Sequence, residues 1–177
     1  MYTVLYILLG IIFLILILAI LAPKSYNVYR SIEINKPKGE VFEYVRFLKN
    51  NSEWSPWEKK DPDMQKRMSG TDGKVGAVSY WNGNKDVGEG EQEITKILPG
   101  ERIESELRFF KPWKSTSDCY LTTEDVSRDV TKVTWGFSGT NKFPMSIMML
   151  FMNMDKAVGK DFEAGLLSLK TRLEGNP

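Results

Sequence analysis

The sequence predicts an α+β domain in which about seven strands, mostly antiparallel, curve around one long C-terminal helix. The first observation is the amphipathic stretch 153–174, whose apolar residues recur at steps of three and four. The second is a series of alternating, strand-like segments between residues 26 and 137 that short connections join. A long one-sided helix needs a partner surface, and a curved sheet with a pocket between the two is the natural one.

The N-terminal run of residues 2–22 is uncharged and mostly apolar. At 1.5 Å per residue it would span roughly 31 Å, about the thickness of the hydrocarbon core of a bilayer. We therefore expect a transmembrane anchor over residues 1–23, with membrane contact through residues 2–22. A cleaved signal peptide is the alternative, but no Lys or Arg precedes the run, and Pro23 directly follows Ala22, the only suitable small residue. A buried core helix would be apolar on one stripe rather than all round.

Positive charges follow this run and none precedes it: Lys24, Arg30, Lys36 and Lys38. The positive-inside rule then predicts a single-pass membrane protein with its C-terminal domain in the cytoplasm. The composition changes only near Pro23, so we expect residues 24–177 to form one domain.

The first part of this domain reads as a strand followed by short helices. Residues 26–36 alternate and predict a half-buried strand. Pro37 suits the first turn of a helix that extends to about residue 49. Pro56 and Pro62 exclude a long helix in the next stretch, so a short helical turn and a loop are expected there.

Strand-like segments dominate the rest of the domain. They cover residues 64–68, 75–81, 87–98, 102–110, 115–123 and 130–137, and turn-forming residues separate them. The pair Pro99–Gly100 predicts a tight turn that closes one hairpin. In the terminal helix, Asp155 lies near the start, Arg172 near the end and Gly175 just beyond, which suits the helix dipole and a C-terminal stop.

The composition excludes several classes of function. The 24 basic and 23 acidic residues leave a formal net charge of +1, which gives no support for nucleic-acid binding. Histidine is absent, which removes the commonest general base and metal ligand. A single cysteine, Cys119, rules out an intrachain disulfide and a cysteine-rich metal site, and it reads as a small buried hydrophobic residue. We therefore expect no metal and no cofactor.

The order of these elements resembles that of the SRPBCC superfamily, also called START-like or Bet v 1-like, whose domains have the helix-grip fold. The stretches that carry the resemblance are INKPKGEVFEYV, WSPWEKKDP, VGEGEQEITKILPGERIESELRFFKPW, VTKVTWGFSGT and GKDFEAGLLSLKTRLE. They cover most of residues 26–174 and are most similar to bacterial polyketide cyclase/dehydrase-like proteins, to which the N-terminal transmembrane segment is an addition. The resemblance implies a helix-grip fold and the binding of a lipid, hormone or polyketide; only some members are enzymes.

Apolar and aromatic side chains are the candidates for the wall of a cavity between the sheet and the terminal helix. In the fold that the sequence resembles, the regions that hold the early tryptophans border the cavity mouth, and plain core packing is the alternative for each. The expected wall consists of Trp54, Trp57, Trp81, Leu107, Phe109, Trp113, Trp135, Phe151, Met154, Val158 and Phe162. Further along the helix, Leu166, Leu169 and Leu173 are expected to seal the core.

The segment 143–154 contains five methionines, whose flexible side chains adapt to variable partners. We favour the first turns of the terminal helix together with a cavity wall. A cavity lid and a patch that touches the membrane are the alternatives.

Glu89, Glu91 and Glu93 lie two residues apart, so a strand places all three on one face. Inside a cavity they would be general bases or cation ligands, but three unpaired carboxylates on a dry face are costly. Arg102 and Arg108 on the next strand supply partners across the sheet. We therefore expect an outer, solvated face and assign no catalytic residue.

Together these observations predict a membrane-anchored binding protein for a hydrophobic small molecule or lipid. The first alternative is a cyclase- or dehydrase-type enzyme that uses a cavity carboxylate or tyrosine. The second is a co-chaperone-like protein-interaction module, which predicts an exposed apolar patch away from the anchor.

Overall fold

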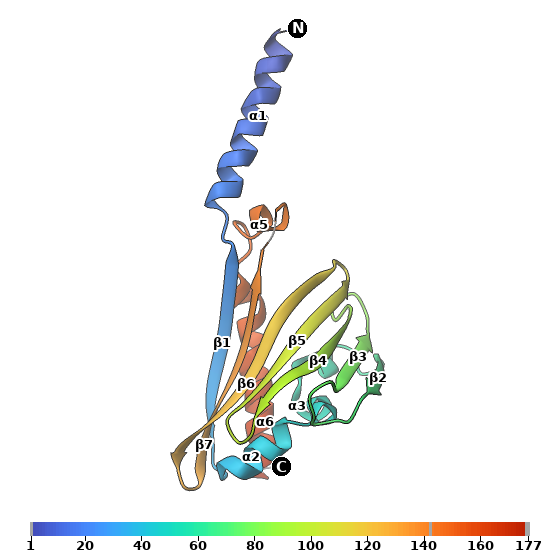
Figure 1. Ribbon diagram of the computed structural model, residues 1–177, viewed down its shortest axis with the longest axis vertical. Helices are drawn as coiled ribbons and strands as arrows, with labels where there is room; N and C mark the ends of the chain where they lie inside the picture. The colour runs from blue at the N-terminus through green and yellow to red at the C-terminus, as the bar shows by residue number, and fades with distance from the viewer. Residues whose placement is uncertain (1, 142, 176–177) are drawn as a thin grey trace.

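An apolar N-terminal helix projects from one end of a domain in which a curved antiparallel sheet wraps a long C-terminal helix (Figure 1). This computed structural model describes residues 2–141 and 143–175. Within that part of the chain the expected fold class is confirmed: seven strands form one open sheet, and short helices follow the first strand.

The elements follow one another in the expected order. The helices are α1 (Tyr2–Leu21), α2 (Lys38–Val45), the 3₁₀ turn η1 (Leu48–Asn50), α3 (Asn51–Trp54), α4 (Pro56–Lys60), α5 (Met145–Met148) and α6 (Met154–Glu174). The strands are β1 (Ser25–Ile34), β2 (Gln65–Ser69), β3 (Val78–Asn82), β4 (Glu89–Leu98), β5 (Arg102–Lys111), β6 (Ser115–Ser127) and β7 (Val130–Thr140).

The sheet has the strand order β1-β7-β6-β5-β4-β3-β2, and each neighbouring pair is antiparallel. Its register aligns apolar residues across strands: Val28 pairs with Phe137, and Phe137 pairs with Cys119. All three side chains are buried. Because successive residues of a strand point to opposite faces, this register gives the sheet one apolar concave face and one outer face.

The helix expected after Pro37 ends earlier than residue 49. It stops at Val45, and a separate 3₁₀ turn begins at Leu48. The carboxylate of Asp72 accepts hydrogen bonds from the backbone N–H groups of Leu48 (2.8 Å) and Lys49 (3.3 Å). These bonds satisfy donors that a continuous helix would have used, so a long-range contact ends the helix.

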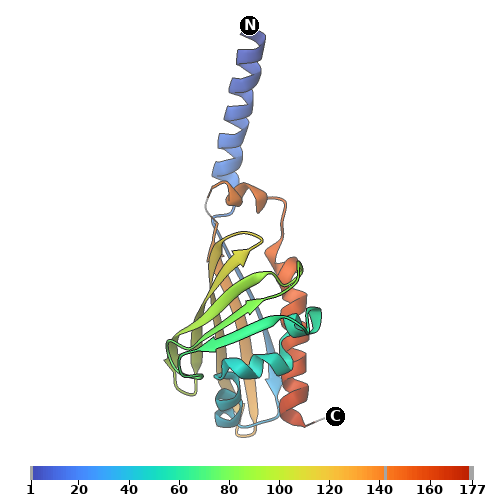
Figure 2. The same ribbon diagram turned by 90° about the vertical axis from the view of Figure 1, so that its right-hand side faces the viewer.

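Helix α6 lies along β1 and against the short helices on the concave side of the sheet (Figure 2). The side chain of Asn153 accepts a hydrogen bond from the N–H of Lys156 (3.0 Å) and caps its N-terminus. Gly175 ends it in the left-handed conformation, with φ of 72°. Both ends therefore match the expected limits, residues 153–174.

The buried stripe of α6 also follows the expected spacing. Phe162, Leu166 and Leu169 are almost fully buried, and Leu173 is half-buried against them. Each fully buried apolar side chain of this size contributes about 1.5–3 kcal/mol relative to an exposed one. The stripe therefore holds the helix in the sheet.

An ion-pair cluster fixes the other contact between α6 and β1. Arg30 donates to Asp155 (2.8 and 3.0 Å) and to Glu163 (2.6 Å). Gly159 lies between the two carboxylates on the same helix face, and a Cβ there would lie only 2.3 Å from the guanidinium. The glycine thus lets Arg30 lie flat against the helix backbone.

The methionine-rich segment does not form the first turns of α6, contrary to the expectation that we favoured. It contains the single turn α5, and residues 149–153 form a connection before α6 begins at Met154. Asn153 has an extended backbone (φ −99°, ψ 103°), which stops helical hydrogen bonding between the two elements.

Candidate ligand-binding site

A pocket of about 460 Å³ lies where the connection between α5 and α6 passes the first residues of β1. Its lining consists of Pro23, Ser25, Tyr26, Asn27, Val28, Asn141 and the run 149–155. That run supplies three methionines, a leucine and a phenylalanine. The wall combines these apolar side chains with hydroxyl, amide and carboxylate groups, which suits an amphipathic small molecule. Pro23 and Ser25 belong to the wall, so the pocket lies next to the residues that directly follow α1 in the chain.

Two of the expected wall residues, Phe151 and Met154, line this pocket. Phe151 is 81% exposed and lies at the outer edge of the pocket wall. Met154 is half-buried and packs against the core at the start of α6. The two residues place the apolar part of the pocket wall at the N-terminal end of the gripped helix.

A row of aromatic rings leads from this pocket into the centre of the domain. Tyr26 lines the pocket, and its ring centre lies 5.3 Å from that of Phe137. Phe137 meets Phe162 edge-on at 6.4 Å, and Phe162 stacks on Trp135 at 4.3 Å. These contacts form one apolar surface from the pocket to the middle of α6.

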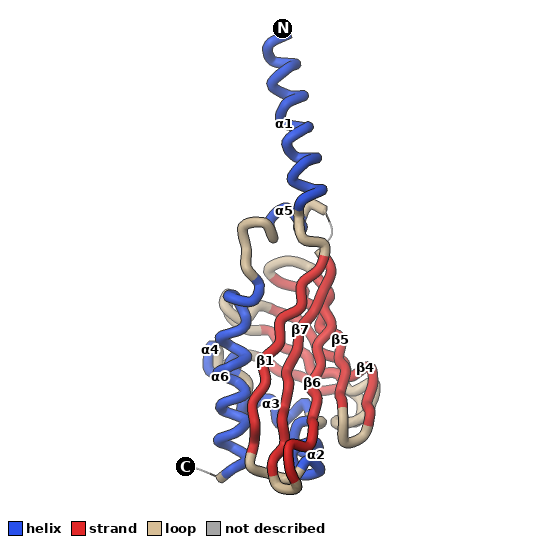
Figure 3. Tube along the Cα trace, turned by 90° about the vertical axis from the view of Figure 1, so that its left-hand side faces the viewer, coloured by secondary structure: helices blue, strands red, loops and turns tan. Residues whose placement is uncertain are grey.

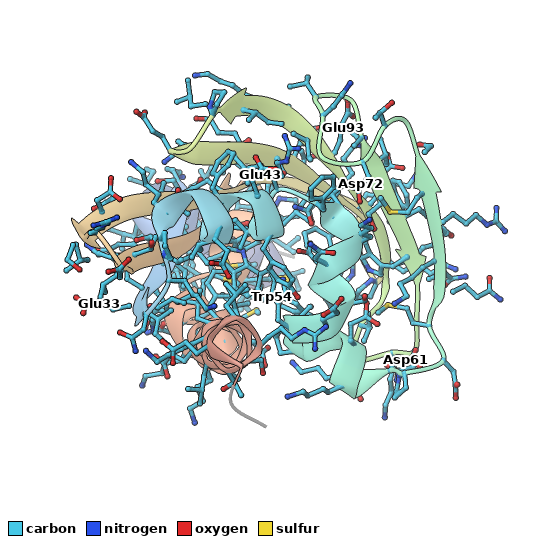
Figure 4. All side chains as sticks on the ribbon, turned by 90° about the horizontal axis from the view of Figure 1, so that it is seen from below. Glu33, Glu43, Trp54, Asp61, Asp72 and Glu93 are labelled. Carbon is cyan, nitrogen blue, oxygen red and sulfur yellow. The ribbon has the colours of Figure 1, made fainter. Side chains whose placement is uncertain are left out.

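Trp54 and Trp57 complete this cluster from the side of the short helices. Their rings meet Trp135 edge-on at 4.9 and 5.6 Å. Figure 4 shows Trp54 in the interior, between α6 and the short helices. Gly165 of α6 lets the indole of Trp135 pack close to the helix, because a Cβ at position 165 would lie 2.8 Å from that ring. In this structure the side chains contact one another and fill the centre of the domain.

The remaining expected wall residues lie in three other places. Trp81 and Phe109 form an edge-on pair at 5.9 Å on the concave face of β3 and β5. Leu107 and Val158 are half-buried against the core. Trp113 is 62% exposed in the turn between β5 and β6 and does not line the pocket next to α1.

The outer face of the sheet carries the glutamates of β4. Arg108 donates to Glu91 (2.6 Å) and Glu93 (2.7 Å), and Lys111 pairs with Glu89 (2.7 Å). The hydrogen bond from Lys111 holds the pKa of Glu89 below its usual range. Figure 4 shows Glu93 at the periphery of the domain. Of the two arginines expected as partners, Arg108 pairs with these carboxylates, whereas Arg102 pairs with Glu104 of its own strand (2.8 Å).

Two titratable groups lie on the concave side near the pocket. Burial raises the pKa of the Tyr26 hydroxyl, which lies 2.8 Å from the hydroxyl of Ser117. Burial also raises the pKa of the Cys119 thiol to about 11, and its sulfur accepts a hydrogen bond from the indole of Trp135 (3.4 Å). Both groups are therefore neutral at physiological pH and contribute to packing rather than to charge.

A second hollow, of about 580 Å³, lies at the same end of the sheet on strands β1, β6 and β7. Most of its lining residues are of polar types: Ser25, Tyr26, Asn27, Thr116, Ser117, Asp118, Tyr120, Ser138, Gly139 and Thr140. Among the described residues, no group of three or more His, Cys, Asp or Glu side chains is placed to hold a metal ion.

Sequence reasoning missed the half of the pocket that β1 supplies. Tyr26 and Val28 belong to the same alternation set of that strand, and Val28 is buried. Their position directly after the apolar N-terminal run is the signal that could have placed them at a pocket next to that run. Asn141 had no such signal, because only the pairing of β7 with β1 brings it there.

No family model matches the chain, and no curated protein matches it. Solved structures do. A protein from Nitrosospira multiformis is 20% identical, with a TM-score of 0.61, over 84% of this chain and 96% of its own. The protein Ara h 8.0201 is 13% identical, with a TM-score of 0.57, over 86% of this chain and 99% of its own.

A third similar structure is the Aha1 dimer from Colwellia psychrerythraea, which is 22% identical, with a TM-score of 0.53, over 86% of this chain and 99% of its own. At these identities the likeness concerns the fold alone. Together with the sheet order and the gripped helix, it shows that the chain has the Bet v 1-like fold.

Proposed function

We propose that this protein is a membrane-anchored binding protein for a hydrophobic small molecule or lipid. The ligand would occupy the pocket between the start of β1 and the connection 149–155, at the outer end of the packed aromatic cluster. The observation that carries the proposal is the apolar lining of this pocket at the end of the domain that adjoins α1.

The anchor in this proposal is α1. Its 20 residues carry no charge, and none of them is buried against the rest of the chain. At 1.5 Å per residue the helix is about 30 Å long, which matches the hydrocarbon core of a bilayer. A signal sequence would have the same length and apolar composition. The mass of the mature protein distinguishes the two, because a cleaved signal sequence would be missing from it. The positive charges after α1 support a cytoplasmic C-terminal domain.

The pocket lining supports an amphipathic ligand with a small polar group. Methionine and phenylalanine side chains adapt to an acyl chain or a ring system. Asn27 and Asn141 supply amides for the polar end. Asp155 also borders the pocket, but Arg30 already pairs with its carboxylate and holds its pKa below the usual range. A cationic headgroup would therefore compete with an existing ion pair.

The enzyme and protein-interaction alternatives rest on no comparable observation in the described part of the chain. The glutamates of β4 point outward and are paired, and burial raises the pKa of the thiol on the concave side. Apart from the region near α1, the exposed large apolar side chains are dispersed over several strands, turns and helices. A ligand-binding role needs neither a reactive group nor such a patch.

The test is native mass spectrometry of the full-length protein released from membranes in a mild detergent. The proposal predicts that a hydrophobic molecule co-purifies at up to one per chain and is lost from the variant Met154→Arg, whose new charge lies in the pocket wall. Leu167→Arg on the exposed side of α6 is the matched control and should keep the molecule. A wild-type protein without any bound molecule, even after exposure to a lipid extract, would contradict the proposal.

A further inference from the structure

One short segment holds the densest group of exposed apolar side chains in the described part of the domain. Of the twelve large apolar residues that are exposed in the described part of residues 24–175, five lie between 143 and 152. They are Phe143, Met148, Leu150, Phe151 and Met152. Phe143 is 64% exposed, although a phenylalanine at a protein surface normally finds cover. We refer to residues 143–152 as the interfacial segment.

The position of the interfacial segment beside the end of α1 indicates which surface covers it. Helix α5, within this segment, contacts α1, and Figure 3 shows it beside the C-terminal end of α1. Only three residues separate Leu21, the last residue of α1, from Ser25, the first residue of β1, so the chain bridges at most about 14 Å. If α1 fills the hydrocarbon core, Leu21 lies at its boundary, and the headgroup layer begins there.

The composition of the segment indicates which kind of surface it suits. Residues 143–153 contain no charged side chain, whereas the domain as a whole is rich in charge. Insertion would therefore depend on apolar contact rather than on attraction to anionic lipid, and short apolar elements of this kind lie within roughly 5–10 Å of the headgroup–acyl boundary. Residues 143–153 also lack the charged side chains with which a protein partner would form ion pairs.

The same side chains line the pocket. Leu150, Phe151 and Met152 are both exposed to the outside and part of the pocket wall. If they lie in the bilayer surface, the mouth of the pocket opens onto lipid and not onto water. An apolar ligand then passes from the membrane to the pocket without crossing the aqueous phase.

We propose, resting on the anchoring role of α1, that the interfacial segment inserts into the surface of the bilayer that α1 spans and so forms a gate through which the pocket takes its ligand directly from the membrane. The occupant is the lipid surface itself, and neutral phosphatidylcholine is sufficient.

Depth-dependent fluorescence quenching of the full-length protein in phosphatidylcholine vesicles tests this. Single cysteines replace Phe151 in the segment, Ile12 in the middle of α1, and Val126 at the opposite end of the sheet; each is labelled with an environment-sensitive dye. The native Cys119 is buried with a raised pKa, so the unsubstituted protein should take up no dye and serves as the blank. Brominated lipids then quench dyes that lie at the depth of the bromine atoms.

The expected result is quenching at position 151 by bromines near the headgroups, quenching at position 12 by bromines deep in the acyl chains, and no quenching at position 126. Quenching at position 12 without quenching at position 151 would overturn the gate while the anchor stands. No quenching at position 12 would overturn the anchor and the gate together. A blue-shifted emission at position 151 without quenching would mean that protein, such as a second copy of the chain, covers the segment, and it would also overturn the proposal.

Discussion

Replacing Phe162 by alanine removes the ring that joins α6 to the sheet. Phe162 is 3% exposed, stacks on Trp135 at 4.3 Å, and meets Trp57 and Phe137 edge-on. Loss of a buried phenylalanine side chain typically costs about 3–5 kcal/mol, because contacts are lost and a cavity remains. For a domain of this size each kcal/mol lowers Tm by about 2–4 °C, so Tm should fall by roughly 6–20 °C.

The assay is thermal unfolding of the full-length protein in detergent, followed by the near-ultraviolet circular dichroism of its tryptophans. The matched control is Leu167→Ala on the exposed face of the same helix, which should change the free energy of unfolding by less than about 0.5 kcal/mol. If Phe162→Ala loses no more stability than this control, the ring borders an open cavity. The packed aromatic cluster would then not be what holds the helix in the sheet.

Three further predictions concern other parts of the fold. Gly90→Ala should destabilise the domain by about 1–3 kcal/mol in urea titrations, since a Cβ there would lie 2.5 Å from a backbone carbonyl oxygen of β5. Its control is Gly39→Ala in α2, where a Cβ would meet nothing within 4 Å; this change should stabilise the domain by about 0.5–1 kcal/mol. Cys119 should resist a thiol reagent in the native protein and react on unfolding, because burial raises its pKa to about 11; rapid native reaction would contradict this burial. Arg30 lowers the pKa of Asp155. Their pair therefore stabilises the fold fully when the pH is above 3.8, the ordinary pKa of an aspartate, and this stabilisation is lost as the pH falls through the lowered pKa. Arg30→Met should therefore flatten the acid limb of the stability profile, and an unchanged limb would argue against the pair.

The fold could be predicted because its elements carry local signals. Apolar spacing and the residues Asn153 and Gly175 set the two ends of α6, and alternation located the seven strands. Where the predicted end of the helix after Pro37 was wrong, a distant contact decided the structure. The carboxylate of Asp72, which follows α4 and β2 in the chain, accepts hydrogen bonds from the N–H groups of Leu48 and Lys49, which would otherwise have continued α2.

The candidate site was only partly accessible from the sequence. Phe151 and Met154 line the pocket as expected, since both belong to an apolar run before the terminal helix. The sheet side of the pocket depends on how β1 pairs with β7, and a single sequence does not contain that register. The pairing of Arg30 in β1 with Asp155 and Glu163 of α6 was likewise not accessible, because only the tertiary fold brings these residues together.

The central claim is that an apolar ligand occupies the pocket next to α1, and binding of a fluorescent fatty-acid probe to the full-length protein in detergent tests it most directly. The account predicts saturable binding to the wild type, an affinity at least about tenfold lower for Met154→Arg, equivalent to about 1.4 kcal/mol, and an unchanged affinity for Leu167→Arg. Equal affinities for all three proteins, or no saturable binding to the wild type, would contradict it.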